Sequence, residues 1–95
     1  MNNYYPGSPA RLRDLTGLGP RSEQLLAEVG IRSVDEFFAA DPYALYATLH
    51  TRKDVSLNFL YAIIGARENR SWQEIAKSRR TEILLRLDDL GLAPK

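Results

Sequence analysis

Several residue types are scarce or missing in this 95-residue chain, and each absence excludes a kind of site. There is no cysteine, which excludes disulfides, thiol catalysis and the usual structural zinc sites. His50 is the only histidine, so no cluster of histidines and cysteines is available to bind a metal. We therefore expect no metal site and no cofactor.

Long apolar runs are also missing. No stretch approaches the roughly 20 apolar residues that a membrane-spanning helix needs, so we expect no contact with a membrane. Residues 1–9 have neither the basic start nor the apolar core of a signal peptide, and we expect them to form a short disordered lead-in. The chain is therefore expected to be cytoplasmic, with one folded domain over residues 10–92.

The chain also lacks a strong excess of either charge. Residues 1–48 hold four arginines and six acids, a net charge of −2, while residues 49–95 hold nine basic residues and six acids, a net charge of +3. A strong nucleic-acid binder usually has an overall basic surface, and this balance does not provide one. Contact with DNA, if it occurs, is expected to be weak.

Signals for catalysis are missing as well. His50, Asp54 and Ser56 supply the residue types of a hydrolase triad, but such sets arise by chance and nothing indicates an oxyanion hole. There is no phosphate-binding lysine motif and no dinucleotide-binding glycine pattern. We therefore expect a protein that is not an enzyme, with no catalytic residues and no small-molecule substrate.

What the chain does contain is a series of helix start and stop signals, which predict an all-α fold. Residues 33–36 and 71–74 are capping boxes, and Asp41-Pro42 is a further start signal. No segment alternates with the two-residue period of a strand. We predict about five or six short helices, drawn from seven candidate segments. These are 10–16, 20–29, a short helix after Ser33, a helix from Pro42, 57–67, 71–77 and about 79–90.

One of these segments is expected at the centre of the fold. Residues 57–67 are apolar nearly all round, which is typical of a helix surrounded by others. Gly65 near its end is expected to permit close packing or to ease termination. Trp72 follows just inside a capping box, and we expect it to pack in the core.

The turn between the first two helices is the main candidate for a binding site. Gly17-Leu18-Gly19 between apolar helical segments is typical of a helix-hairpin-helix unit, with Pro20 in the first turn of the second helix. Such a turn directs backbone N–H groups and a helix N-terminus at one spot, which can hold a phosphate. The phosphate or DNA contacts would be Gly17, Gly19 and Arg21.

Two features bear on this interpretation. Glu23 places a carboxylate one turn into the helix, where it would repel a phosphate. Further along, Arg79 and Arg80 offer a possible second contact, within a basic group flanking Trp72. That group is either a patch for nucleic acid or an acidic partner, or an ordinary solvated face interleaved with glutamates. Its members are Arg67, Arg70, Lys77, Arg79 and Arg80.

A protein-contact surface is the other candidate. Phe37 and Phe38 are adjacent, so their side chains point to different sides of a helix. Either one of them is exposed and marks a contact surface, or a neighbouring helix covers both.

Taken in order, these motifs resemble a known family. Residues 12–31, with the hairpin, and residues 56–66, with the central helix, resemble the C-terminal domain of the TfoX (Sxy) family of bacterial competence regulators. Trp72 and the closing residues 87–91 also fit. The resemblance implies an all-helical domain with a helix-hairpin-helix start, a role in DNA uptake and competence-gene regulation, and no known catalysis. Many members add an N-terminal partner domain, so the chain is either a stand-alone member or an excised domain.

Two functions follow. The first is a non-enzymatic module of competence or transcription regulation that contacts a protein partner, or DNA weakly and without sequence preference, through the hairpin. The second is a protein-interaction or assembly module in which the hairpin is purely structural and no nucleic acid is bound.

Overall fold

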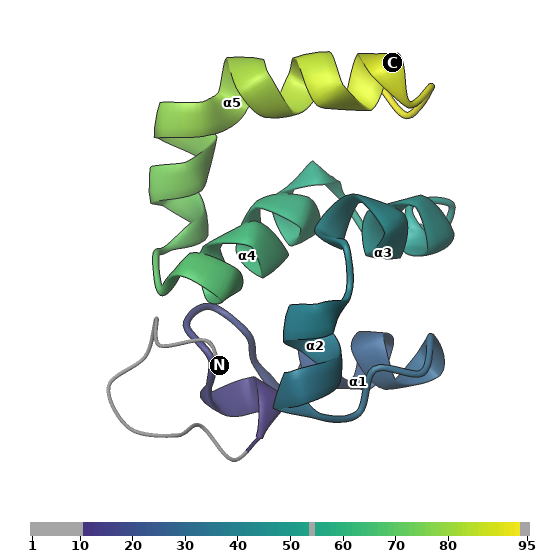
Figure 1. The fold of residues 1–95 in the computed structure, drawn as a ribbon, viewed down its shortest axis with the longest axis vertical. Helices are drawn as coiled ribbons and strands as arrows, with labels where there is room; N and C mark the ends of the chain where they lie inside the picture. The colour runs from purple at the N-terminus through teal and green to yellow at the C-terminus, as the bar shows by residue number, and fades with distance from the viewer. Residues whose placement is uncertain (1–10, 54, 94–95) are drawn as a thin grey trace.

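The computed structural model describes residues 11–53 and 55–93, and this part of the chain is built from helices and turns without a strand. Figure 1 shows the helices in chain order. The predicted all-α fold is confirmed. The elements are a 3₁₀ turn η1 (Leu12–Asp14) and the helices α1 (Pro20–Glu28), α2 (Val34–Ala39), α3 (Pro42–Leu49), α4 (Leu57–Glu68) and α5 (Trp72–Asp89).

The first element is shorter than predicted. In place of a helix over 10–16 there is the single turn η1, and residue 10 lies outside the described residues. Two further turns continue from it, because the N–H of Leu15 donates to Leu12 and that of Leu18 donates to Leu15. This three-residue repeat directs Leu12, Leu15 and Leu18 inward, where all three are buried.

The predicted helix starts at α2 and α3 are confirmed. The Ser33 hydroxyl accepts from the N–H of Glu36 at 3.1 Å, and the Asp41 carboxylate accepts from the N–H of Tyr43 at 3.1 Å. Each side chain satisfies an N–H group that the helix itself leaves unpaired. The two helices therefore begin where the sequence places them.

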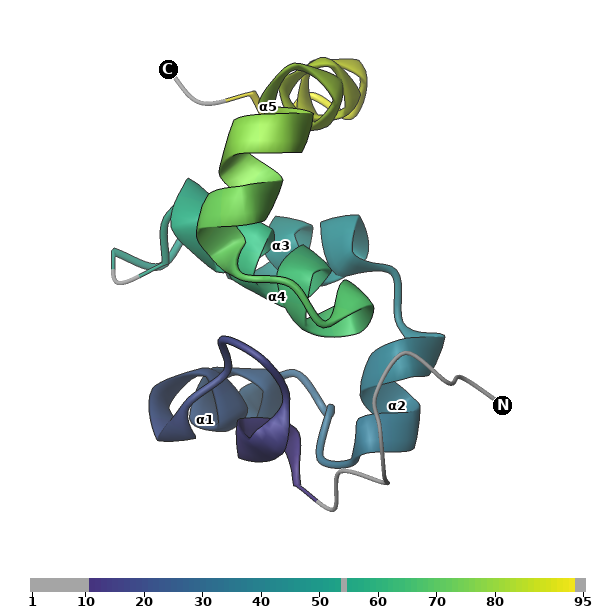
Figure 2. The same cartoon turned by 90° about the vertical axis from the view of Figure 1, so that its left-hand side faces the viewer.

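α4 lies at the centre, as its composition predicts (Figure 2), and most of its residues are buried. Gly65 is required near its end, since a Cβ there would collide with the backbone carbonyl oxygen of Arg70. The chain folds back so tightly because Asn69 adopts the left-handed conformation, with φ at 57°, and the N–H of Arg70 donates to Gly65 at 2.9 Å.

Two predictions about α5 are wrong. It is one continuous helix over Trp72–Asp89, whereas the sequence predicts a break near Ser78, and Figure 1 shows that it bends instead. The Ser78 hydroxyl donates to the carbonyl of Glu74 at 2.6 Å, a contact that commonly bends helices. Trp72 is 36% exposed and not in the core, because Ile75 fills the buried position in this turn.

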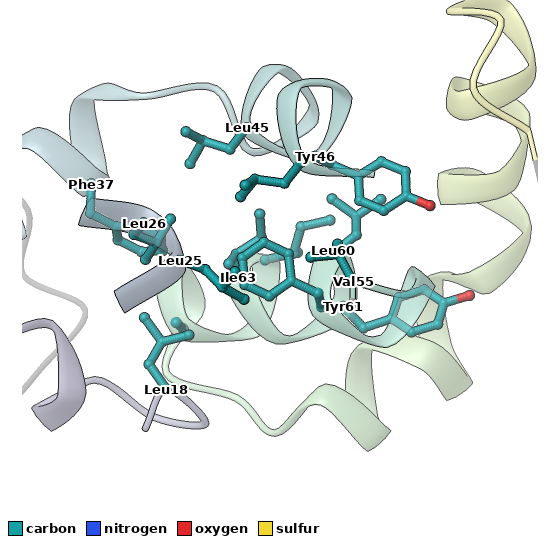
Figure 3. Packing of buried hydrophobic residues seen from close by; sticks show 14 of the residues in the cluster. Leu18, Leu25, Leu26, Phe37, Leu45, Tyr46, Val55, Leu60, Tyr61 and Ile63 are labelled. Atoms are coloured by element: carbon teal, nitrogen blue, oxygen red, sulfur yellow. The ribbon is translucent and has the colours of Figure 1, made fainter. Parts of the chain in front are cut away.

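The core joins α1 and α2 to α3 and α4. Figure 3 shows side chains of α1 and α2 meeting Leu60 and Ile63 of α4. On the other side, the hydroxyls of Tyr46 and Tyr61 point toward α5. The Tyr61 hydroxyl is buried and has no hydrogen-bond partner among the described residues.

Candidate functional site

The turn between η1 and α1, residues 15–19, is the segment that the sequence predicts to be a hairpin, and we call it the hairpin. Gly17 has a φ of +79°, a conformation that favours glycine, and Leu18 anchors the turn with only 5% of its surface exposed. Gly19 precedes α1 in an extended conformation, with Pro20 as the first helical residue. No side chain of the described part of the chain caps this helix start. The N-cap residue, Gly19, thus offers backbone and no side chain at the N-terminus of α1.

Arg21 lies in the first turn of α1 and is exposed. The three predicted phosphate contacts, Gly17, Gly19 and Arg21, therefore fall in one short stretch at the helix N-terminus. The positive end of the helix dipole and a guanidinium are the groups that favour a phosphate. The arrangement can attract one anionic group.

Glu23 has a role that the sequence does not reveal. Its carboxylate accepts from the Arg13 guanidinium at 2.7 and 3.0 Å and from the Arg13 backbone N–H at 3.4 Å. These hydrogen bonds lower the pKa of Glu23 below its ordinary value of 4.5. The ion pair holds η1 against α1. The positive charge of Arg13 also compensates the negative charge of Glu23, which was expected to repel a phosphate. The signal in the sequence that could have predicted this ion pair is the opposite charge of Arg13 and Glu23, which lie on either side of a glycine turn.

Thr16 ties the hairpin to a distant part of the chain. Its hydroxyl donates to the side-chain carbonyl of Asn69, in the turn between α4 and α5. Both ribbon views place the hairpin beside this turn (Figures 1 and 2). The link joins residues 53 positions apart, and no local sequence pattern predicts it.

Two members of the basic group flanking Trp72 are engaged within the chain. The Arg67 guanidinium donates to the carbonyls of Phe37, Phe38 and Ala40 at 3.2, 3.2 and 2.9 Å, and so caps the end of α2. Arg79 forms an ion pair with Glu68. Arg80 is exposed, so it is the more accessible of the two predicted second contacts.

The adjacent phenylalanines differ in exposure. Phe37 is fully buried, which excludes it as a surface contact in this fold. Phe38 is half-buried, lies edge-on to Phe37, and has the Arg67 guanidinium 6.0 Å from its ring centre. The structure therefore matches neither expectation in full, because Phe37 belongs to the core and Phe38 is neither exposed nor fully covered.

Metal-binding and membrane-spanning features are both missing from residues 11–53 and 55–93. No group of three or more histidine, aspartate or glutamate side chains in this part of the chain is arranged to hold a metal ion. Nor does any helix there have the length and apolar character required to cross a membrane.

Comparison with known proteins identifies the family to which the chain is similar. The chain matches the TfoX C-terminal domain over residues 8–87, which include the hairpin, the central helix and most of α5. No curated protein and no solved structure matches it significantly. Since the match spans most of the 95 residues, the chain belongs to the TfoX C-terminal domain family.

Proposed function

We propose that this chain is a non-enzymatic regulatory module linked to DNA transformation competence and transcription, and that it acts by contact with other macromolecules. Membership of the TfoX C-terminal domain family supports the regulatory role. The activity itself would be binding, through the hairpin, to the phosphates of DNA.

The start of α1 carries this proposal. It has no side-chain cap among the described residues, it bears the exposed Arg21, and the carboxylate of Glu23 is already paired with Arg13. A phosphate would meet the helix dipole and a guanidinium without facing an uncompensated acid. Because one hairpin supplies few phosphate contacts, binding would be weak, independent of sequence and sensitive to salt. Arg80 is the better candidate for a second contact, since Arg79 pairs with Glu68.

The test is a titration of labelled double-stranded DNA at low and near-physiological salt. We expect binding that weakens as salt rises, and Arg21→Ala should lower the slope of log affinity against log salt by about 1. Arg32→Ala is the matched control, because Arg32 is also exposed but lies beyond the other end of α1. Equal losses in the two variants would show a non-specific charge effect and contradict the proposed site.

A structural hairpin is the second candidate, and specific contacts favour it. The Arg13–Glu23 pair, the Thr16–Asn69 hydrogen bond and the buried Leu18 all hold the turn in place without any ligand. On this alternative the chain is a protein-interaction or assembly module. It would show no binding to DNA even at low salt.

A further inference from the structure

A groove lies between the start of α3 and the second half of α5, residues 81–89, which we call the C-terminal arm. Its volume is about 650 Å³. Figure 1 shows the C-terminal arm at the opposite end of the long axis from η1 and α1. The groove is therefore separate from the hairpin.

An exposed leucine lines this groove. Leu85 is 62% exposed, more than Trp72 or Leu90, the other exposed large apolar side chains among the described residues. Pro42 and Tyr43 line the same groove from α3. A single exposed leucine on a convex surface would need no explanation, but here it lies in a hollow with two further partly buried apolar side chains.

Acidic side chains flank Leu85 on the same helix face. Glu82 precedes it by three residues and Asp89 follows it by four, which places all three on one side of the C-terminal arm. Neither acid has an ion-pair partner within the described part of the chain. Asp89 also lies in the last turn of α5, where the negative end of the helix dipole disfavours an acid. Helix stability therefore does not explain its position.

Of the two arginines that line the groove, Arg67 is engaged outside it and Arg86 lies over the groove residue Tyr43. The Arg67 guanidinium donates to the carbonyls at the end of α2, and the Arg86 guanidinium lies 5.7 Å from the ring centre of Tyr43. Their positive charges are therefore held close to protein groups. Neither guanidinium forms an ion pair with Glu82 or Asp89 in the described part of the chain, so these acids can pair with cations from a partner.

We propose that this groove binds a basic segment of a partner protein, with an apolar side chain seated against Leu85 and lysines or arginines paired with Glu82 and Asp89. These acids are two helical turns apart, about 10 Å. A helical partner would present the same spacing, with cations seven residues apart and the apolar residue between them. This inference does not depend on the DNA contact, since the two surfaces share no residue.

The test uses synthetic peptides and the full chain. The probe is a fluorescein-labelled 15-residue helical peptide with two lysines seven residues apart and one leucine between them. One control peptide replaces the lysines with glutamate, and another replaces the leucine with serine. We expect saturable binding of the first peptide alone, with amide chemical-shift changes at Tyr43 and along the C-terminal arm.

Matched variants locate the binding surface. Leu85→Ser should weaken binding about tenfold, because the variant removes the apolar surface that the peptide leucine would bury. Glu82→Gln combined with Asp89→Asn should weaken it about fivefold. Leu90→Ser and Asp88→Asn are the controls, since both residues are exposed at the end of α5 but lie outside the groove. They should leave affinity unchanged.

Several results would overturn the proposal. These are no binding of the lysine peptide, equal binding of the glutamate peptide, or equal losses in the control variants. Dimers of the wild type that Leu85→Ser abolishes would instead assign the groove to a second copy of the chain. DNA binding by the same variants separates the two proposals. If Arg21→Ala abolishes DNA binding and Leu85→Ser preserves it, the hairpin acts without the groove, so failure of one proposal does not affect the other.

Discussion

The role of Glu23 becomes clear only when its neighbours in the fold are known. In the sequence it is an acid at the N-terminus of a helix that would bind DNA. In the fold it accepts three hydrogen bonds from Arg13, across a glycine turn. Phe37 is a candidate contact residue in the sequence, but in the fold it is a fully buried core residue. Residue types alone predicted the candidates, but only the packing assigns their roles.

The Glu23 pair should make stability depend on pH. Because the folded-state pKa of Glu23 is lowered, its stabilising contribution is present above the ordinary value of 4.5 and is lost as the pH falls through the lower, folded value. We expect Glu23→Gln to lower the melting temperature at neutral pH, and this difference from wild type to shrink as the pH falls below 4.5. Glu82→Gln, whose carboxylate is unpaired in the described part of the chain, should differ little from wild type.

Gly17 is the residue on which the hairpin conformation most depends. Its φ of +79° is poorly accessible to a β-branched side chain, so Gly17→Val should lower the free energy of unfolding by about 1–3 kcal/mol. Urea denaturation would measure it. Gly19→Ala is the control, because Gly19 is extended and no atom lies within 4 Å of the Cβ it would gain. Equal losses at both positions would mean that the backbone of Gly17 is not the cause.

Helix starts and the apolar centre were the elements that the sequence predicted best. Capping residues act over two or three positions, so Ser33 and Asp41 could be identified without tertiary information. The continuity of α5 could not, because whether a helix breaks or bends at Ser78 depends on what its two halves pack against. The exposure of Trp72 escaped prediction for the same reason.

Gly65 provides a prediction for α4, in which the sign of the change in the free energy of unfolding is informative. In an ordinary helix, replacing glycine with alanine stabilises by up to about 1 kcal/mol. Here the new methyl group would collide with the backbone of Arg70, so Gly65→Ala should destabilise by about 1–3 kcal/mol. A rise in the free energy of unfolding would contradict the close approach between the end of α4 and the turn that follows it.

Across the whole molecule, long-range side-chain contacts decide how the hairpin is held. The Thr16–Asn69 and Arg67–α2 hydrogen bonds each join residues at least 27 positions apart. Sequence patterns predict local structure, whereas these pairs become visible only when the helices are assembled. For this reason the basic group around Trp72 and the hairpin contacts were the least predictable parts of the candidate site.

Asn69 offers a test of the hairpin link. Asn69→Gly retains easy access to the left-handed conformation and loses only the hydrogen bond to Thr16, so we expect a loss of about 0.5–1.5 kcal/mol. Asn69→Ala loses the bond and also strains the backbone, adding about 1 kcal/mol. Thermal unfolding of the pair separates the two effects. Equal stability of the two variants would contradict the left-handed backbone at this position.

The order of the helices has a consequence for how quickly the protein folds. α4 packs chiefly against α3 and α5, its neighbours in the chain, and η1 packs against α1. Chains whose contacts are mostly local fold fast, in microseconds to milliseconds. The hairpin must instead close over 53 residues to reach Asn69, so we expect its docking to complete folding and its release to begin unfolding.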